Sequence, residues 1–201
     1  MSRPCWAGVD VGAAKGFDVA AIDEDGVAFC PRRIVEVQGV LNVARDLKPR
    51  VVAVDSPASP APAGERSRPD ERKFKEAKIC GIRYTPDEKG MAVNPGYYGW
   101  IFNGFRLYEA LGDLEPRGVQ TIECFPTATW TRLAGPRGSV SRARWSRKAL
   151  EGRTLAGVPA RTNQDGRDAI GAALTARAYD LGETENFGRI VVPRSGISSA
   201  G

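Results

Sequence analysis

Histidine is absent from all 201 residues of this chain. Its absence excludes Ser-His-Asp and Cys-His catalysis, and it excludes the HExxH site of zinc metalloproteases. Any chemistry must therefore use carboxylates, lysine, arginine, hydroxyls or thiols. Carboxylate oxygens are hard ligands that suit Mg²⁺ or Mn²⁺. A catalytic metal site in this chain would consequently be built from oxygen donors.

Closely spaced cysteines and long apolar runs are also lacking. The four cysteines form no CxxC pair, which excludes zinc-ribbon spacing and favours reduced, mostly buried thiols. No apolar run reaches the length of a membrane span, and the opening MSRPCWAGVDVG lacks the apolar stretch of a signal peptide. We therefore expect a cytoplasmic protein with no membrane partner.

The composition is that of a soluble globular protein. Hydrophobic residues make up 42% of the chain and charged residues 26%, so one domain with a sizeable core is expected. We predict a single domain over residues 1–194 and a flexible C-terminal tail over 195–201. The net charge of +5 is compatible with a nucleic-acid partner, although charge alone does not require one.

Hydrophobic patterning predicts the order of the elements. The chain opens with strands predicted over 5–11, 17–23 and 27–37, a helix over 39–48 and an apolar strand over 51–55. Later strands are predicted over 118–125 and 188–193, and later helices over 70–79, 97–112, 141–152 and 165–181. This order is the plan of the ribonuclease H-like fold, an α/β class. We expect a mixed sheet of strand order 3-2-1-4-5, with the third strand at an antiparallel edge and helices on its flanks.

Acidic residues end several of the apolar runs. Asp10 lies in AGVDVG, Asp55 in VVAVDSP and Glu123 in TIECFP. A buried carboxylate is costly unless it is compensated, and the carboxyl ends of parallel strands meet at one edge of a sheet. Asp165 and Asp168 share a face near the start of the last predicted helix. The set predicts a site for Mg²⁺ or Mn²⁺, and a pair of ions would clamp the attacking and leaving oxygens of phosphoryl transfer.

The same carboxylates have plainer interpretations. Asp10 and Asp55 could be turn residues, and Asp165 could cap its helix. Glu123 could bind metal, or it could pair with a basic residue such as Arg68 or Lys148. These alternatives stay open at the level of sequence.

Basic residues gather in two segments. The first follows Asp55 and contains Arg66, Arg68, Arg72 and Lys73. Arginines beside a metal site suit bidentate phosphate binding. The second, SRARWSRKALEGR at 141–153, holds Lys148 and Arg153 and could contact a nucleic-acid backbone. A solvated, salt-bridged surface is the plainer interpretation of both segments.

Six motifs, taken in order, resemble a known family. They are GVDVG with Asp10, VAVDSP with Asp55, GERSRPDER with Arg66, Arg68 and Asp70, IECFPTA with Glu123, SRKALEGR with Lys148 and Arg153, and DGRDAIGAALTA with Asp165 and Asp168. In this set the chain is similar to the bacterial and archaeal proteins called domain of unknown function 429 (DUF429), which are described as predicted nucleases of ribonuclease H-like fold. The resemblance implies metal-dependent hydrolysis of phosphodiester bonds.

The order of the acidic residues is also similar to that of the Holliday-junction resolvase branch of this fold. That similarity implies Asp10, Asp55 and Asp168 as the primary metal ligands of a two-metal carboxylate mechanism. Asp165 and Glu123 are second choices, and Lys148 or Arg68 would steady the developing charge. Two other functions stay open. One is a non-catalytic nucleic-acid or protein-binding module of the same fold; the other is an actin-like phosphotransferase or ATPase, which would need a dimer to close over its nucleotide.

Overall fold

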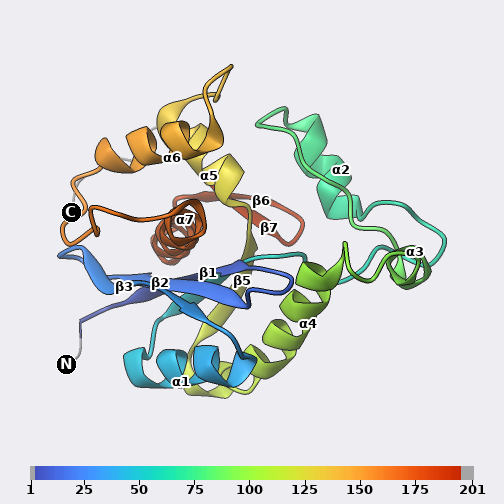
Figure 1. Ribbon diagram of the computed structural model, residues 1–201, viewed down its shortest axis with the longest axis horizontal. Coiled ribbons are helices and arrows are strands. Elements are labelled where there is room, and N and C mark those ends of the chain that lie inside the picture. The colour runs from blue at the N-terminus through green and yellow to red at the C-terminus, as the bar shows by residue number, and fades with distance from the viewer. Residues whose placement is uncertain (1–2, 196–201) are drawn as a thin grey trace.

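A seven-stranded mixed sheet runs through the centre of the protein in the computed structural model, which describes residues 3–195 (Figure 1). Its strands are β1 (Trp6–Val11), β2 (Phe17–Ile22), β3 (Val27–Ile34), β4 (Val51–Asp55), β5 (Gln120–Cys124), β6 (Thr184–Phe187) and β7 (Ile190–Pro193). Of the tail expected at 195–201, only Ser195 falls within the described residues.

The strand order is β3-β2-β1-β4-β5-β7-β6. β1, β2 and β3 form an antiparallel meander, whereas β4 and β5 continue the sheet parallel to β1. The first five strands therefore have the predicted order, with β3 at one edge, and the fold is ribonuclease H-like. The β6–β7 hairpin extends the sheet beyond β5. Sequence patterning missed β6 because Thr-Glu-Asn-Phe shows no apolar alternation.

Helices cover both faces of the sheet (Figure 1). One face carries α1 (Val37–Leu47) and α4 (Gly99–Gly112), and the other carries α5 (Pro126–Ala134), α6 (Arg142–Glu151) and α7 (Gln164–Asp180). Helix α5 escaped prediction because its threonines are poor helix formers, although Pro126 suits a first helical turn. A short 3₁₀ turn, η1 (Glu115–Arg117), leads from α4 towards β5.

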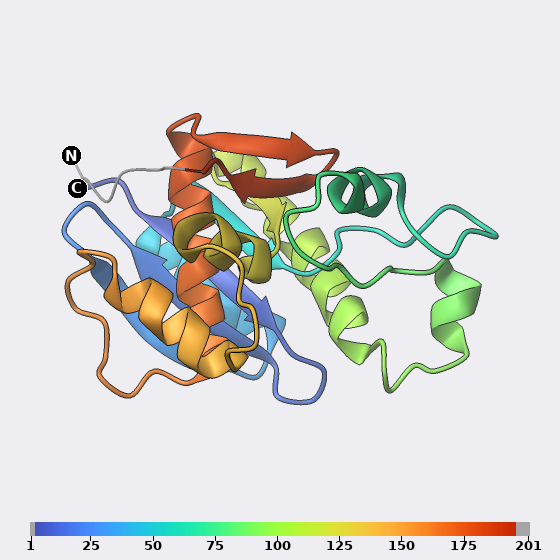
Figure 2. The ribbon, with the colours of Figure 1, turned by 90° about the horizontal axis from the view of Figure 1, so that it is seen from above.

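The segment between β4 and α4, residues 56–98, leaves the sheet and forms a lobe at its side (Figure 2). It carries α2 (Pro69–Glu76) and the short α3 (Glu88–Ala92), which lies between the helices predicted over 70–79 and 97–112, where no element was predicted. Phe74 of α2 is fully buried and packs edge-to-face against Phe125 and Phe187. This aromatic cluster ties the lobe to the core. None of the helices within residues 3–195 has the length and apolar character of a membrane span.

Alternation along the strands decides which side chains meet α7. On β1, Ala7, Val9 and Val11 join the core beneath α1 and α4, so Gly8 and Asp10 point to the opposite face. A Cβ atom at Gly8 would lie 2.1 Å from the carbonyl oxygen of Ala169 and 2.2 Å from the backbone nitrogen of Ala173. Glycine therefore lets the backbone of α7 rest directly on β1.

We expect Gly8→Ala to lower the free energy of unfolding by about 3 kcal/mol, because its methyl group would push α7 away from the sheet. Urea unfolding followed by circular dichroism measures the change. Gly112→Ala is the matched control, since no atom lies within 4 Å of the added Cβ at the end of α4. Equal unfolding midpoints for the two variants would contradict the close packing of α7 on β1.

Candidate metal centre

Three carboxylates from distant parts of the chain converge at the carboxyl edge of the sheet. Asp10 and Asp55 end the neighbouring parallel strands β1 and β4, and their Cα atoms are register partners. Val51 and Ala53 belong to the core under α7, so Asp55 continues the same face as Asp10. The buried Asp168, 1% exposed, reaches this place from the first turns of α7.

Burial, together with mutual repulsion, raises the pKa values of these carboxylates. Burial raises the pKa of Asp10 to about 6, against the opposing charge of Lys15, and Asp168 raises it further. Burial also raises the pKa of Asp55 well above its usual value, with Asp10 and Asp168 adding to the shift. Carboxylates in this situation stay ionised together only when a cation compensates them.

Asp168 is held in place by three donors. The indole nitrogen of Trp130 donates to Oδ1 at 2.9 Å. Arg142 and Gln164 both donate to Oδ2, each at 2.9 Å. Burial raises the pKa of Asp168, and Arg142, Gln164 and Trp130 oppose the shift. The carboxylate is therefore oriented before any ligand arrives.

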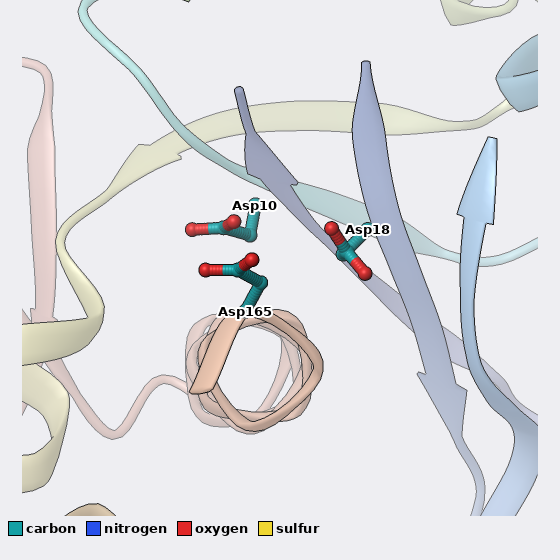
Figure 3. A group of neighbouring side chains, drawn as sticks. All are labelled: Asp10, Asp18 and Asp165. Carbon is teal, nitrogen blue, oxygen red and sulfur yellow. The ribbon is translucent and has the colours of Figure 1, made fainter. Parts of the chain in front are cut away.

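A second group of carboxylates shares Asp10. Oxygen atoms of Asp10, Asp18 and Asp165 all lie within 4.8 Å of one another (Figure 3). Asp18 is the register partner of Asp10 on β2, and it is not among the site residues predicted from the sequence. The signal was available, because a short hairpin turn fixes which residue of β2 lies opposite Asp10.

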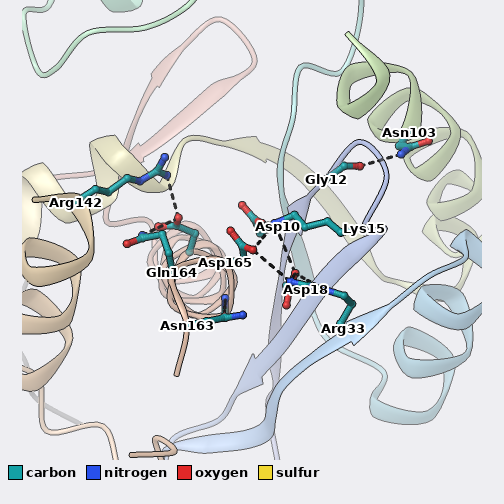
Figure 4. Close-up of polar contacts among 12 residues, drawn as sticks. Asp10, Gly12, Lys15, Asp18, Arg33, Asn103, Arg142, Asn163, Gln164 and Asp165 are labelled. Atoms are coloured by element: carbon teal, nitrogen blue, oxygen red, sulfur yellow. Dashed lines mark hydrogen bonds and ion pairs between the residues drawn. The ribbon is translucent and has the colours of Figure 1, made fainter. Parts of the chain in front are cut away.

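Two basic side chains lie among these carboxylates (Figure 4). The ammonium of Lys15 is 2.5 Å from Asp165, 3.1 Å from Asp10 and 3.7 Å from Asp18. Arg33 bridges Asp18 and Asp165 at 3.2 and 3.3 Å. Asp165 does not cap α7, because the side chain of Asn163 accepts the backbone hydrogen bond from Gly166. The capping interpretation of Asp165 is therefore wrong.

Glu123 points away from this centre. It pairs in register with Val54, on the opposite face of the sheet from Asp55. Its two carboxylate oxygens accept hydrogen bonds from the guanidinium of Arg68, and one of them also accepts from the backbone nitrogen of Ala58. Of the two interpretations offered by the sequence, pairing with Arg68 is the one that the geometry bears out.

The predicted basic residues are spread over several places. Lys148 lies on the exposed face of α6, and Arg142 is the residue of this helix that contacts Asp168. Arg153 lines a pocket with Ile22 and Asp23, beside the start of β1 and thus at the far end of that strand from Asp10.

The four basic residues that follow Asp55 also separate. Arg68 is buried between Glu71 and Glu123, whereas Arg72 pairs at the surface with Glu65. Arg66 and Lys73 are exposed. Of these four, only Arg68 lines the cleft described next.

A cleft of about 820 Å³ opens beside Asp55. One wall is formed by residues 79–83 of the lobe together with Trp100, and the other by parts of α5 and α6. Its charged lining includes Arg83, Arg137 and Arg142. The carboxyl edge of the sheet is thus reached through a space with a basic rim, at the place where ligands bind in open α/β sheets.

The chemistry of the centre fits a hard divalent cation. Its potential ligands are carboxylate oxygens, and the part shared by Asp10, Asp18 and Asp165 already attracts the ammonium of Lys15 as an internal cation. Oxygen-only ligand sets of this kind suit Mg²⁺ or Mn²⁺ rather than zinc or copper.

No protein-family model matches this chain, and no curated protein matches it in sequence. Among solved structures it is similar to Thermus thermophilus RuvC, with 17% identity and a TM-score of 0.45 over 89% of this chain and 96% of that chain. It is also similar to T. thermophilus RuvC in complex with Holliday junction substrate, with 16% identity and a TM-score of 0.49 over 89% of this chain and 96% of that chain. The yeast mitochondrial Holliday junction resolvase Ydc2 is a third similar structure, with 14% identity and a TM-score of 0.47 over 83% of this chain and 75% of that chain. At these identities the likeness assigns no function.

The raised pKa of Asp10 predicts a pH-dependent stability. With a folded pKa of about 6 and an unfolded value near 3.8, the native state binds more protons than the unfolded state between these pH values. In EDTA, Asp10 therefore makes the free energy of unfolding fall as the pH rises from 4 to 7, by about 3 kcal/mol. Urea unfolding of wild type and Asp10→Asn across this range measures the effect. Parallel pH profiles would show that Asp10 titrates normally.

Proposed function

We propose that this protein is a divalent-metal-dependent nuclease that hydrolyses phosphodiester bonds, and that it belongs to the DUF429 family. One observation carries the proposal. Asp10, Asp55 and Asp168, from two parallel strand ends and one helix, converge on one face of the sheet with raised pKa values. Clustered buried carboxylates cost stability, and such a cost is typical of functional sites. Binding a divalent ion is the function that the chemistry of this cluster suits.

Asp10, Asp55 and Asp168 would hold Mg²⁺ or Mn²⁺. When bound, the ion supplies Lewis-acid activation and neutralises charge that develops on phosphate oxygens. The sequence resemblance implies two ions, and the number of ions that bind depends on Lys15. Trp130 and Gln164 keep Asp168 oriented, so the ligand does not have to be ordered when the ion binds.

The cleft supplies the substrate side of the proposal. Arg142 lines it while donating one hydrogen bond to Asp168, and its side chain is 43% exposed, so it is placed to bind a phosphate next to the metal ligands. Arg137 and Arg83 add positive charge along the rim, and Trp100 offers a surface on which a base can stack. Lys148 is exposed on the outer face of α6, and in this proposal it contacts the nucleic-acid backbone rather than the reacting phosphate.

The proposal is tested with purified protein and end-labelled substrates: single-stranded, duplex and branched DNA, and the corresponding RNA. We expect cleavage with Mg²⁺ or Mn²⁺ and none with EDTA. Salt-sensitive binding of every substrate without product would favour a non-catalytic binding module instead. Tight ATP binding measured by calorimetry would favour the phosphotransferase alternative.

A further inference from the structure

The ammonium of Lys15 occupies the place where a second metal ion would be expected. It contacts Asp10 and Asp165 at 3.1 and 2.5 Å and lies 3.7 Å from Asp18. Asp10 is also one of the three proposed metal ligands, so Lys15 and the proposed ion would share one carboxylate. Two cations that share a bridging carboxylate are the usual arrangement of a two-metal site.

The turn that carries Lys15 is fixed in place. The backbone nitrogen of Gly12 donates to the carbonyl oxygen of Gly16 at 2.7 Å, and Gly16 has a φ of +79°, which favours glycine. The side-chain amide of Asn103, on α4, donates to the carbonyl oxygens of Gly12 and Ala13 at 2.8 and 2.7 Å (Figure 4). Both strands and a helix therefore hold Lys15 against the carboxylates, unlike a lysine at the end of a mobile loop.

The charges of the centre leave room for one divalent ion. Its five carboxylates are Asp10, Asp18, Asp55, Asp165 and Asp168. Its three cationic side chains are Lys15, Arg33 and Arg142. Five negative and three positive charges leave two negative charges, which a single divalent ion neutralises. With Lys15 in place, a second divalent ion would give the buried centre two net positive charges, against one if the charge of Lys15 is removed.

We propose that Lys15 is a tethered cation that takes the place of a second divalent ion, so that the centre binds one Mg²⁺ or Mn²⁺ at Asp10, Asp55 and Asp168. This inference rests on the proposed metal-dependent function. Lys15 is then a positioning residue: it holds the shared carboxylate of Asp10 on the side away from Asp55 and neutralises the Asp18 side of the centre. The two-metal arrangement implied by the sequence resemblance becomes one metal ion and one ammonium.

The number of bound ions tests the inference directly. Mn²⁺ binding is measured by electron paramagnetic resonance and by titration calorimetry on wild type, Lys15→Met and Lys89→Met. Lys89 is the matched control, because it is exposed on α3 of the lobe. We expect one Mn²⁺ per chain in wild type and in Lys89→Met. Lys15→Met should bind two, and its first ion should bind about tenfold more tightly because a competing charge is gone.

Thermal unfolding in EDTA at pH 8 gives a second readout. Lys15→Met should melt at least about 3 °C below wild type and Lys89→Met, because the carboxylates lose a counter-charge, and Mn²⁺ should restore the melting temperature. Lys15→Gln repeats the test if the methionine variant does not fold. The number of Mn²⁺ ions bound to the wild-type chain tests the inference without any variant.

The possible failures are distinguishable. Two ions bound to wild type, or one ion bound to both wild type and Lys15→Met with equal melting temperatures, would overturn the tethered cation while leaving the metal-dependent nuclease in place. No ion bound to wild type would overturn the nuclease proposal and the tethered cation together.

Discussion

Asp10→Asn should abolish divalent-metal-dependent cleavage, with a loss of at least about a thousandfold in rate. Asp10 is the carboxylate common to the group formed with Asp55 and Asp168 and to the group formed with Asp18 and Asp165. The asparagine side chain keeps the shape of the residue but carries no charge, so it would weaken the hold on the ion and on Lys15 at once. Cleavage of labelled substrate at saturating Mn²⁺ measures the effect.

Stability separates this loss of activity from unfolding. Because burial and Asp168 make the ionised form of Asp10 unfavourable, Asp10→Asn should be at least as stable as wild type in EDTA at pH 7. Asp46→Asn is the control, since Asp46 is exposed on α1 over the opposite face of the sheet. Equal cleavage rates for Asp10→Asn and wild type would refute the proposed metal centre.

The parts of the centre that were predictable from sequence are those with a strong local pattern. VVAVD is a continuous apolar run ending in a carboxylate, so both the strand β4 and the position of Asp55 follow from it. The three opening strands and the right-handed return of β4 beside β1 then bring Asp10 next to Asp55. Asp165 and Asp168 were predicted as site residues on one helix face, because they are three residues apart at the start of a long run of small residues.

Other features depend on information that sequence patterns do not carry. Glu123 ends an apolar run just as Asp55 does, but it lies one residue out of phase, and the alternation of a strand sends it to the other face. The partners of the carboxylates, Lys15, Arg33 and Arg142, come from a turn, an edge strand and a helix that meet only in the folded chain. GAAKG on its own predicts a turn and says nothing about the three carboxylates that surround its lysine.

Arg68→Met should lower the free energy of unfolding by about 3–5 kcal/mol, because it leaves two buried carboxylates without their counter-charge. Arg68 is 2% exposed, and its guanidinium donates to Glu71 at 3.0 Å and to both oxygens of Glu123. Burial lowers the pKa of Arg68, but the hydrogen bonds and charges of Glu123 and Glu71 outweigh it and raise the pKa above its usual value. The three residues join the lobe, at the start of α2, to β5 in the core.

Urea unfolding of a double-mutant cycle separates the pair from its surroundings. Arg68→Met and Glu123→Met should each be strongly destabilising, whereas the double variant should be more stable than the sum of the two losses predicts, since two apolar side chains then fill the same space. Arg72→Met is the matched control: its partner Glu65 is 42% exposed, so the loss should stay below about 1 kcal/mol. A loss for Arg68→Met as small as that of Arg72→Met would show that Arg68 is not a structural residue. The phosphate-binding role that the sequence predicts for it would then be the better explanation. The geometry favours the structural role, because a guanidinium held by two internal carboxylates has little left to offer a substrate.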